Sequence, residues 1–132
     1  LRCGRPIVMM SLDVTHQVLT TRKRVDAIRN LDSTVGEPIA SLIEFYERYD
    51  EEKYHLDGAP LHDPCTIAYL IKPDLFSLKE VNVEVETEGD FTRGATVVDY
   101  WDVTERTPNV QWAHSVDDEG FFKLLNTYLS KV

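Results

Sequence analysis

The feature that most constrains the fold is the apolar run from Ile7 to Leu12, which only Ser11 interrupts. A run of this kind, without polar alternation, predicts a strand buried on both faces of a sheet. Such a strand needs neighbours on both sides, so it is an awkward first element for a complete domain. The run is also far shorter than the roughly 18 residues that a membrane span requires, and we expect no membrane partner.

Helical patterns follow this strand. A partial apolar stripe predicts a helix from about Thr15 to Leu31, with an interruption at residues 20–24. The next helix is expected from Pro38 to about Lys53, and its apolar side chains recur at i, i+3, i+4 and i+7, the spacing of one helical face. These side chains are Ile39, Leu42, Ile43 and Tyr46. The third helix runs to about Ile71 and is apolar nearly all round, so we expect it to be buried.

The sequence pattern of the second half of the chain predicts a β-sheet. Residues 81–86 alternate apolar and polar side chains, which predicts a half-exposed strand, and residues 95–101 predict another. A third strand carries Val110, Trp112 and Val116 on one face, and an amphipathic helix ends the chain. The order predicts an α/β fold: one buried strand and helices, then a small antiparallel region and a terminal helix, as one domain over residues 1–132.

Charge and cysteine content limit the function. The chain has 14 Lys and Arg and 23 Asp and Glu, which gives a net charge of -9. A chain of this charge repels a polyanion, so we do not expect nucleic-acid binding. The two cysteines, Cys3 and Cys65, cannot form a disulfide framework in a chain of this length. We therefore expect a reducing, cytoplasmic setting.

The pair His62-Asp63 is the densest candidate for chemistry, and each residue has a plain alternative. Histidine is the side chain best suited to give a proton near neutral pH, but a lone histidine at a helix start is more often a surface residue. Asp63 offers oxygens to a cation, but Asp followed by Pro64 is also a strong helix start with the aspartate as N-cap. Tyr46 fits a core position by its spacing, while Cys65 lacks a base partner and suits a buried apolar position.

Two segments closely resemble the inosine-uridine-type nucleoside hydrolases. They are Ser11-Leu-Asp-Val-Thr-His-Gln-Val-Leu19 and Ala59-Pro-Leu-His-Asp-Pro-Cys-Thr-Ile-Ala-Tyr69. The likeness continues through Pro73–Phe76, Val81–Glu86, the turn ending at Gly94, and Thr96–Asp99, and thus spans essentially the whole chain. The His-Asp-Pro-Cys segment is the most specific part, and the strands are less so.

The resemblance implies hydrolysis of the N-glycosidic bond of ribonucleosides to ribose and free base, as in nucleoside salvage. It implies a Ca²⁺ ion held by aspartates and by the ribose hydroxyls, with Asp63 as one ligand and His62 as the residue that activates the leaving base. Tyr46, Asp50 and Tyr54, together with His62, are the candidates for binding the substrate, by their position before the His-Asp pair. The familiar glycosidase scheme uses two carboxyls, whereas here a metal positions water and sugar.

The sequence departs from the family in what it lacks. The family's aspartate-rich motif, D-x-D-x-x-x-D-D, and its Asn- and Glu-bearing ribose segment are absent from these residues. A single carboxylate cannot hold calcium tightly, so we expect the C-terminal portion of a nucleoside hydrolase with little activity alone. Its partner would be a missing N-terminal segment or further copies of itself. The alternative is a non-catalytic fragment that serves as an oligomerisation or small-molecule-binding module.

Overall fold

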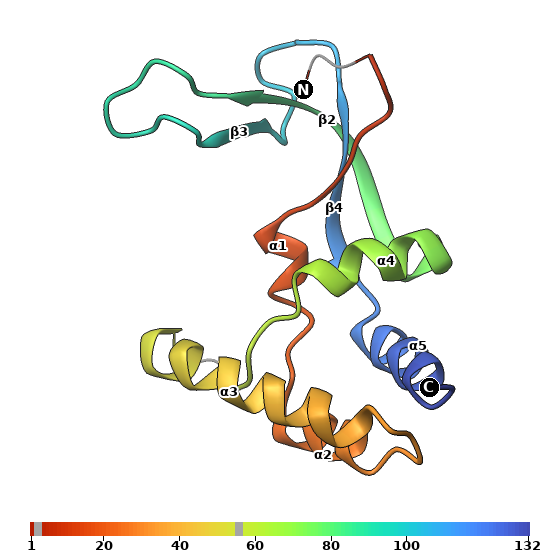
Figure 1. Cartoon of the computed structure of the whole chain (residues 1–132). Helices are drawn as coiled ribbons and strands as arrows, with labels where there is room; N and C mark the ends of the chain where they lie inside the picture. Colours follow the sequence, from red (N-terminus) through yellow and green to blue (C-terminus); the bar gives the residue numbers. More distant parts are fainter. Residues whose placement is uncertain (2–3, 55–56) are drawn as a thin grey trace.

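The computed structural model describes residues 1, 4–54 and 57–132, with the side chains of residues 48–54 outside that description. A twisted sheet occupies one end of the molecule and most of the helices occupy the other (Figure 1). The elements follow the order β1 (Val8–Met10), α1 (Leu12–Thr15), α2 (Arg22–Arg29), α3 (Gly36–Tyr54), α4 (Asp63–Ile71), the 3-10 turn η1 (Pro73–Leu75), β2 (Phe76–Val85), β3 (Thr96–Asp99), β4 (Val110–Val116) and α5 (Asp118–Leu129).

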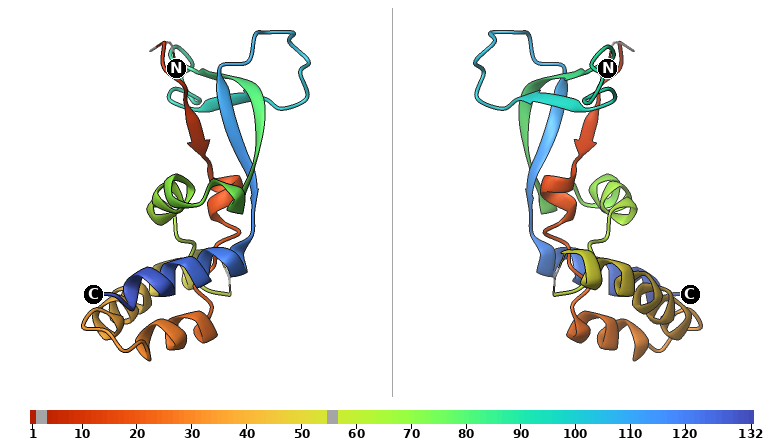
Figure 2. Two further views of the ribbon diagram at one scale, coloured as in Figure 1. Left: turned by 90° about the vertical axis from the view of Figure 1, so that its right-hand side faces the viewer. Right: turned by 90° about the vertical axis from the view of Figure 1, so that its left-hand side faces the viewer.

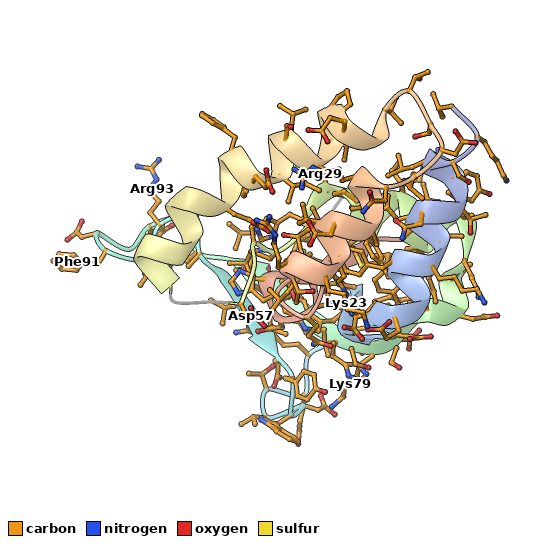
Figure 3. The ribbon with its side chains drawn as sticks, turned by 90° about the horizontal axis from the view of Figure 1, so that it is seen from below. Lys23, Arg29, Asp57, Lys79, Phe91 and Arg93 are labelled. Carbon is orange, nitrogen blue, oxygen red and sulfur yellow. The ribbon has the colours of Figure 1, made fainter. Side chains whose placement is uncertain are left out.

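The sheet has the strand order β1-β4-β2-β3. β4 is its centre, parallel to β1 with Val8 opposite Gln111, and antiparallel to β2. β2 continues beyond β4 to pair with β3, and the turn between them extends away from the helices (Figure 1). Phe91 and Arg93 lie at the outer end of this turn (Figure 3), where the Phe91 side chain is fully exposed. The predicted α/β fold with a small antiparallel region is confirmed.

β1 differs from its prediction in burial. Its residues are half-buried, because β4 is the only strand that pairs with β1 in the described part of the chain. Met10 packs on one side of the sheet, while Ile7 and Met9 pack on the other. The apolar run therefore does contribute to both faces, but its outer edge has no neighbour among the described residues.

Three apolar clusters hold the elements together. The central cluster joins the segment after β1 to α4, the sheet and α5, and its buried members are Val14, Val18, Cys65, Ala68, Leu75, Phe76, Ala113, Phe121 and Phe122. The sheet cluster consists of Val81, Val83, Val110 and Trp112. The helical cluster consists of Val25, Ile28 and Ala40 and joins α2 to α3, the two helices at the end opposite the sheet (Figure 2).

Two helix predictions are wrong in instructive ways. The helix expected over residues 15–31 is shorter and is limited to α2, because residues 18–20 instead form backbone hydrogen bonds with residues 59–61. The helix that reaches Ile71 was expected to be buried, yet Ile67 is 58%, Leu70 75% and Ile71 44% exposed. Only the face bearing Cys65 and Ala68 is covered, since just one side of α4 meets the central cluster.

None of the helices in the described ranges combines the length and apolar character that crossing a bilayer requires.

Candidate functional site

The site begins with the loop that leads into α4. The backbone N–H of Thr20 donates to the carbonyl of Ala59 at 2.9 Å, and the N–H of Leu61 donates to the carbonyl of Val18 at 3.0 Å. The buried Thr20 hydroxyl adds a third bond, to the same Ala59 carbonyl at 2.7 Å. These bonds close a short antiparallel bridge, which fixes where α4 starts and therefore where His62 and Asp63 lie.

Gly58 makes this bridge possible. Its φ of +111° is a conformation that L side chains rarely adopt. A Cβ at this position would also lie 2.5 Å from the carbonyl oxygen of Thr20, a contact that side chains do not tolerate. The glycine thus allows the loop backbone to approach the strand-like segment that carries Thr20.

His62 is the N-cap residue of α4, and its ring is held from the N-terminal side of the fold. Nδ1 of His62 lies 2.8 Å from the hydroxyl oxygen of Thr15, the last residue of α1, which is only 2% exposed. The His16 ring lies beside it, with 5.6 Å between the ring centroids. α1 and the start of α4 accordingly lie side by side (Figure 1 and Figure 2).

Asp63 is the first residue of α4 and not its N-cap, so the N-cap prediction is wrong. The backbone of His62 is already in the right-handed helical region, which moves the start of the helix one residue earlier. The Asp63 side chain is exposed, and no described residue donates a hydrogen bond to its carboxylate. Its backbone carbonyl accepts a bond from the Thr66 hydroxyl at 2.8 Å. The carboxylate therefore faces outward, free of any capping role.

A cavity of about 350 Å³ brings the predicted residues together. His62, Asp63 and Tyr46 all line it, with apolar walls from α3 and from the loop before α4. Its volume falls within the range of small-ligand pockets, which are largely apolar with a few placed polar groups. Tyr46 is 55% exposed, so its core interpretation is wrong and the substrate-facing one is compatible with the structure.

The helix that carries Tyr46 divides its apolar stripe between two surroundings. Ile39 packs against the helical cluster, and Leu42 and Tyr46 line the cavity. Ile43 lies between the two and contributes to both. The other two residues predicted to bind substrate, Asp50 and Tyr54, have side chains that lie outside the described residues.

The described residues do not assemble a metal site by themselves. No group of three or more His, Cys, Asp or Glu side chains lies together in the ranges that the structure describes. Asp63 contributes one carboxylate, whereas Ca²⁺ takes six to eight oxygen ligands. The donor set thus falls short of calcium unless further ligands come from elsewhere.

Cys65 lies one turn into α4 and takes no part in the cavity. It is fully buried, and its thiol donates to the carbonyl of Leu61 at 3.1 Å. Burial raises the pKa of the Cys65 thiol to about 11. A thiol held neutral in this way is a poor nucleophile. The prediction of a buried apolar role is confirmed.

Sequence reasoning missed two residues of the site, Thr15 and Thr20. Both residues are almost fully buried. The Thr15 hydroxyl bonds to His62, the last residue of the loop before α4, and the Thr20 hydroxyl bonds to Ala59 within that loop. The spacing of 47 residues between Thr15 and His62 leaves no local pattern that reveals the contact. The available signal was that Thr15 lies in the short segment after the carboxyl end of β1, a common location for functional residues in α/β folds.

Comparison with known proteins identifies the family to which this fold belongs. The family model described as inosine-uridine preferring nucleoside hydrolase matches residues 1–123. The chain therefore belongs to the inosine-uridine preferring nucleoside hydrolase family, as the two resembling segments predicted.

Particular relatives are similar over nearly the whole chain. The pyrimidine-specific ribonucleoside hydrolase RihA of Klebsiella pneumoniae is 46% identical over 123 residues, which is 92% of this chain and 40% of that protein. The purine-preferring ribonucleoside hydrolase from Gardnerella vaginalis has a TM-score of 0.82 at 34% identity and covers 98% of this chain and 41% of its own. A plant nucleoside hydrolase has a TM-score of 0.85 at 29% identity, covering 98% and 43%. The chain thus spans about two fifths of the length of these relatives.

Proposed function

We propose that this chain supplies the leaving-group side of a ribonucleoside hydrolase active site. The observation that carries the proposal is the shared cavity of His62, Asp63 and Tyr46, a mostly apolar recess lined by a histidine and by a carboxylate that no described residue pairs with. An apolar recess suits a flat nucleobase, and Tyr46 offers it a ring and a hydroxyl. His62 then lies where the departing base needs a proton.

Hydrolysis of an N-glycosidic bond is accelerated by such a proton donor. Hydrolysis attaches a water oxygen to the anomeric carbon of ribose, while the electron pair of the C–N bond leaves with the base. Negative charge therefore develops on the base, and a positioned acid that neutralises it contributes typically 10²–10⁴-fold in rate. His62 is our candidate for that acid. We find no second candidate for the general base among the described residues at this cavity, so we assign it to the part of the relatives that these 132 residues do not cover.

We also propose that Asp63 gives one carboxylate to a Ca²⁺ site whose other ligands come from that same part, which these residues do not cover. Its exposed carboxylate, without a hydrogen-bond donor in the described part of the chain, is compatible with this role. Two features of the surface suit a docked partner of this kind. The outer edge of β1 is open among the described residues, and an almost wholly apolar groove of about 570 Å³ lies between α4 and α5.

This groove supports the proposal because it shares Asp63 and Pro64 with the candidate site. Ile67 and Ile71 line the groove and are exposed to solvent. A contiguous exposed apolar surface of this kind is typical of an interaction site. A partner that covers the groove would therefore reach the site at Asp63. We propose a cytoplasmic setting, as nucleoside salvage implies, and Cys65 forms no disulfide within the described part of the chain.

Reconstitution tests the proposed function. The chain is mixed with calcium, inosine or uridine, and the N-terminal three fifths of the Klebsiella pneumoniae relative, and ribose release is measured as reducing sugar. We expect release only from the complete mixture, and a loss of about 10²–10⁴-fold with His62→Ala, greatest for the poorer leaving base. Absence of release from a mixture in which both parts are folded and associated would refute the proposal.

The alternative is a non-catalytic module in which a second copy of the chain covers the groove and the edge of β1. Light scattering separates the two, because this alternative requires a stable homo-oligomer whose formation blocks association with the N-terminal part.

A further inference from the structure

The contact between Thr15 and His62 determines which ring nitrogen can reach a substrate. The Thr15 hydroxyl lies 2.8 Å from Nδ1, a full hydrogen bond, and Thr15 is buried at the end of α1. The two nitrogens of an imidazole lie on opposite sides of the ring, so a partner on Nδ1 leaves Nε2 for other contacts. His62 lines the cavity, and with Nδ1 engaged by Thr15 we take Nε2 as the nitrogen that contacts a ligand there.

A hydroxyl differs from a carboxylate as a partner for this nitrogen. A carboxylate only accepts, so it favours the charged imidazolium, whereas a hydroxyl both donates and accepts. The Thr15 hydroxyl can therefore donate to Nδ1 when this nitrogen is bare and accept from it when it is protonated. It fixes the orientation of the ring without forcing either charge state.

The backbone around Thr15 makes this partner rigid. The N–H of Thr15 donates to the carbonyl of Ser11 at 3.0 Å, and α1 follows β1 with a single residue between them. Val14, next to Thr15, is a fully buried member of the central cluster. The Thr15 hydroxyl on such an element has little conformational freedom. The position of this hydroxyl therefore determines the orientation of the His62 ring.

We infer that Thr15 is a positioning residue that holds the His62 ring by Nδ1 and reserves Nε2 for proton transfer to the departing base. This inference rests on the proposed function of His62. In the step, the electron pair of the C–N bond goes to the base, and a base nitrogen takes the proton from Nε2 of the imidazolium. The ring becomes neutral and keeps the proton on Nδ1, which donates to the Thr15 hydroxyl oxygen.

Two variants separate the hydroxyl from the shape of the side chain. Thr15→Val is nearly isosteric and lacks the hydroxyl, while Thr15→Ser keeps it. The first readout is the NMR spectrum of the ring nitrogens and Nδ1–H proton of His62 in the chain itself. At a pH where the ring is protonated, we expect an Nδ1–H signal protected from solvent exchange in the wild type and in Thr15→Ser. It should be lost in Thr15→Val.

The second readout is the kinetics of the reconstituted hydrolase. We expect Thr15→Val to lower kcat by up to about 100-fold with KM nearly unchanged, because the acid is misplaced while the base pocket is intact. Thr15→Ser should restore most of kcat. An unprotected Nδ1–H in the wild type, or equal kcat in Thr15→Val and wild type, would overturn the inference. If His62→Ala leaves ribose release intact while the protected Nδ1–H is present, the proposed function fails and the inferred proton transfer fails with it. The Thr15–His62 bond then stands as structure alone.

Discussion

Replacement of Gly58 by alanine is the sharpest test of how the site is held. The Gly58 backbone has φ +111°, and a non-glycine residue in such a sparsely populated region costs about 1–3 kcal/mol. The new Cβ would also lie 2.5 Å from the Thr20 oxygen, 2.6 Å from the Thr20 carbonyl carbon and 2.9 Å from the Thr21 nitrogen. All three are backbone atoms, so no rotamer change relieves the contact, and overpacking of this kind costs about 1–3 kcal/mol more.

The expected loss in the free energy of unfolding is therefore about 2–6 kcal/mol, a large share of the 5–15 kcal/mol typical of a folded domain. Urea unfolding of the chain, followed by circular dichroism, measures it. Gly94 provides a matched control, since its φ is +90° but a Cβ there would meet nothing within 4 Å. Gly94→Ala should show the conformational cost alone. If Gly58→Ala is no more destabilising than Gly94→Ala, the close approach of the loop to Thr20 does not constrain the site.

Three further predictions concern the surroundings of the site. Because burial raises the pKa of the Cys65 thiol from 9.0 to about 11, the unfolded chain loses this proton first. The free energy of unfolding should then fall between pH about 9 and about 11, and Cys65→Ala should remove that part of the slope in pH-dependent urea titrations. Arg24 bonds Asp118 and, at 2.8 Å, Glu119, so Arg24→Lys should lower the free energy of unfolding by about 1–2 kcal/mol in thermal denaturation. Glu119→Gln removes an 86% exposed partner and should change the free energy of unfolding by less than about 0.5 kcal/mol. In the reconstituted hydrolase, Asp63→Asn should raise the calcium concentration for half-maximal activity by about 10-fold or more, and an unchanged calcium dependence would exclude Asp63 as a ligand.

Local patterns predicted most of the elements because their signals lie within single stretches of chain. The amphipathic spacing around Ile43 and the period-two alternation from Val81 onward both correspond to observed elements, α3 and β2. The sequence predicts an interruption at residues 20–24, whereas the observed non-helical stretch before α2 is residues 16–21. Its cause is the pairing of residues 18–20 with a loop about 40 residues later, which no local pattern contains.

The difference between local sequence patterns and contacts of distant residues also explains the wrong predictions at the site. An all-apolar pattern shows that α4 can be buried, but whether a partner covers Ile67 and Leu70 depends on residues outside the helix. The predicted N-cap at Asp63 failed by one residue, within the ordinary uncertainty of helix ends. The pairing of His62 with Thr15 is a tertiary contact, and only the folded chain reveals it.

The parallel pairing of β1 with β4 has a consequence for how the protein folds. Val8 lies opposite Gln111, so this ladder closes a loop of roughly 100 residues, at an entropic cost of about 4 kcal/mol. Folds dominated by such distant pairings form slowly. During synthesis, β1 must wait for β4 to leave the ribosome before it finds its partner. Until then α1, and with it the hydroxyl that holds His62, lacks its contacts with β4.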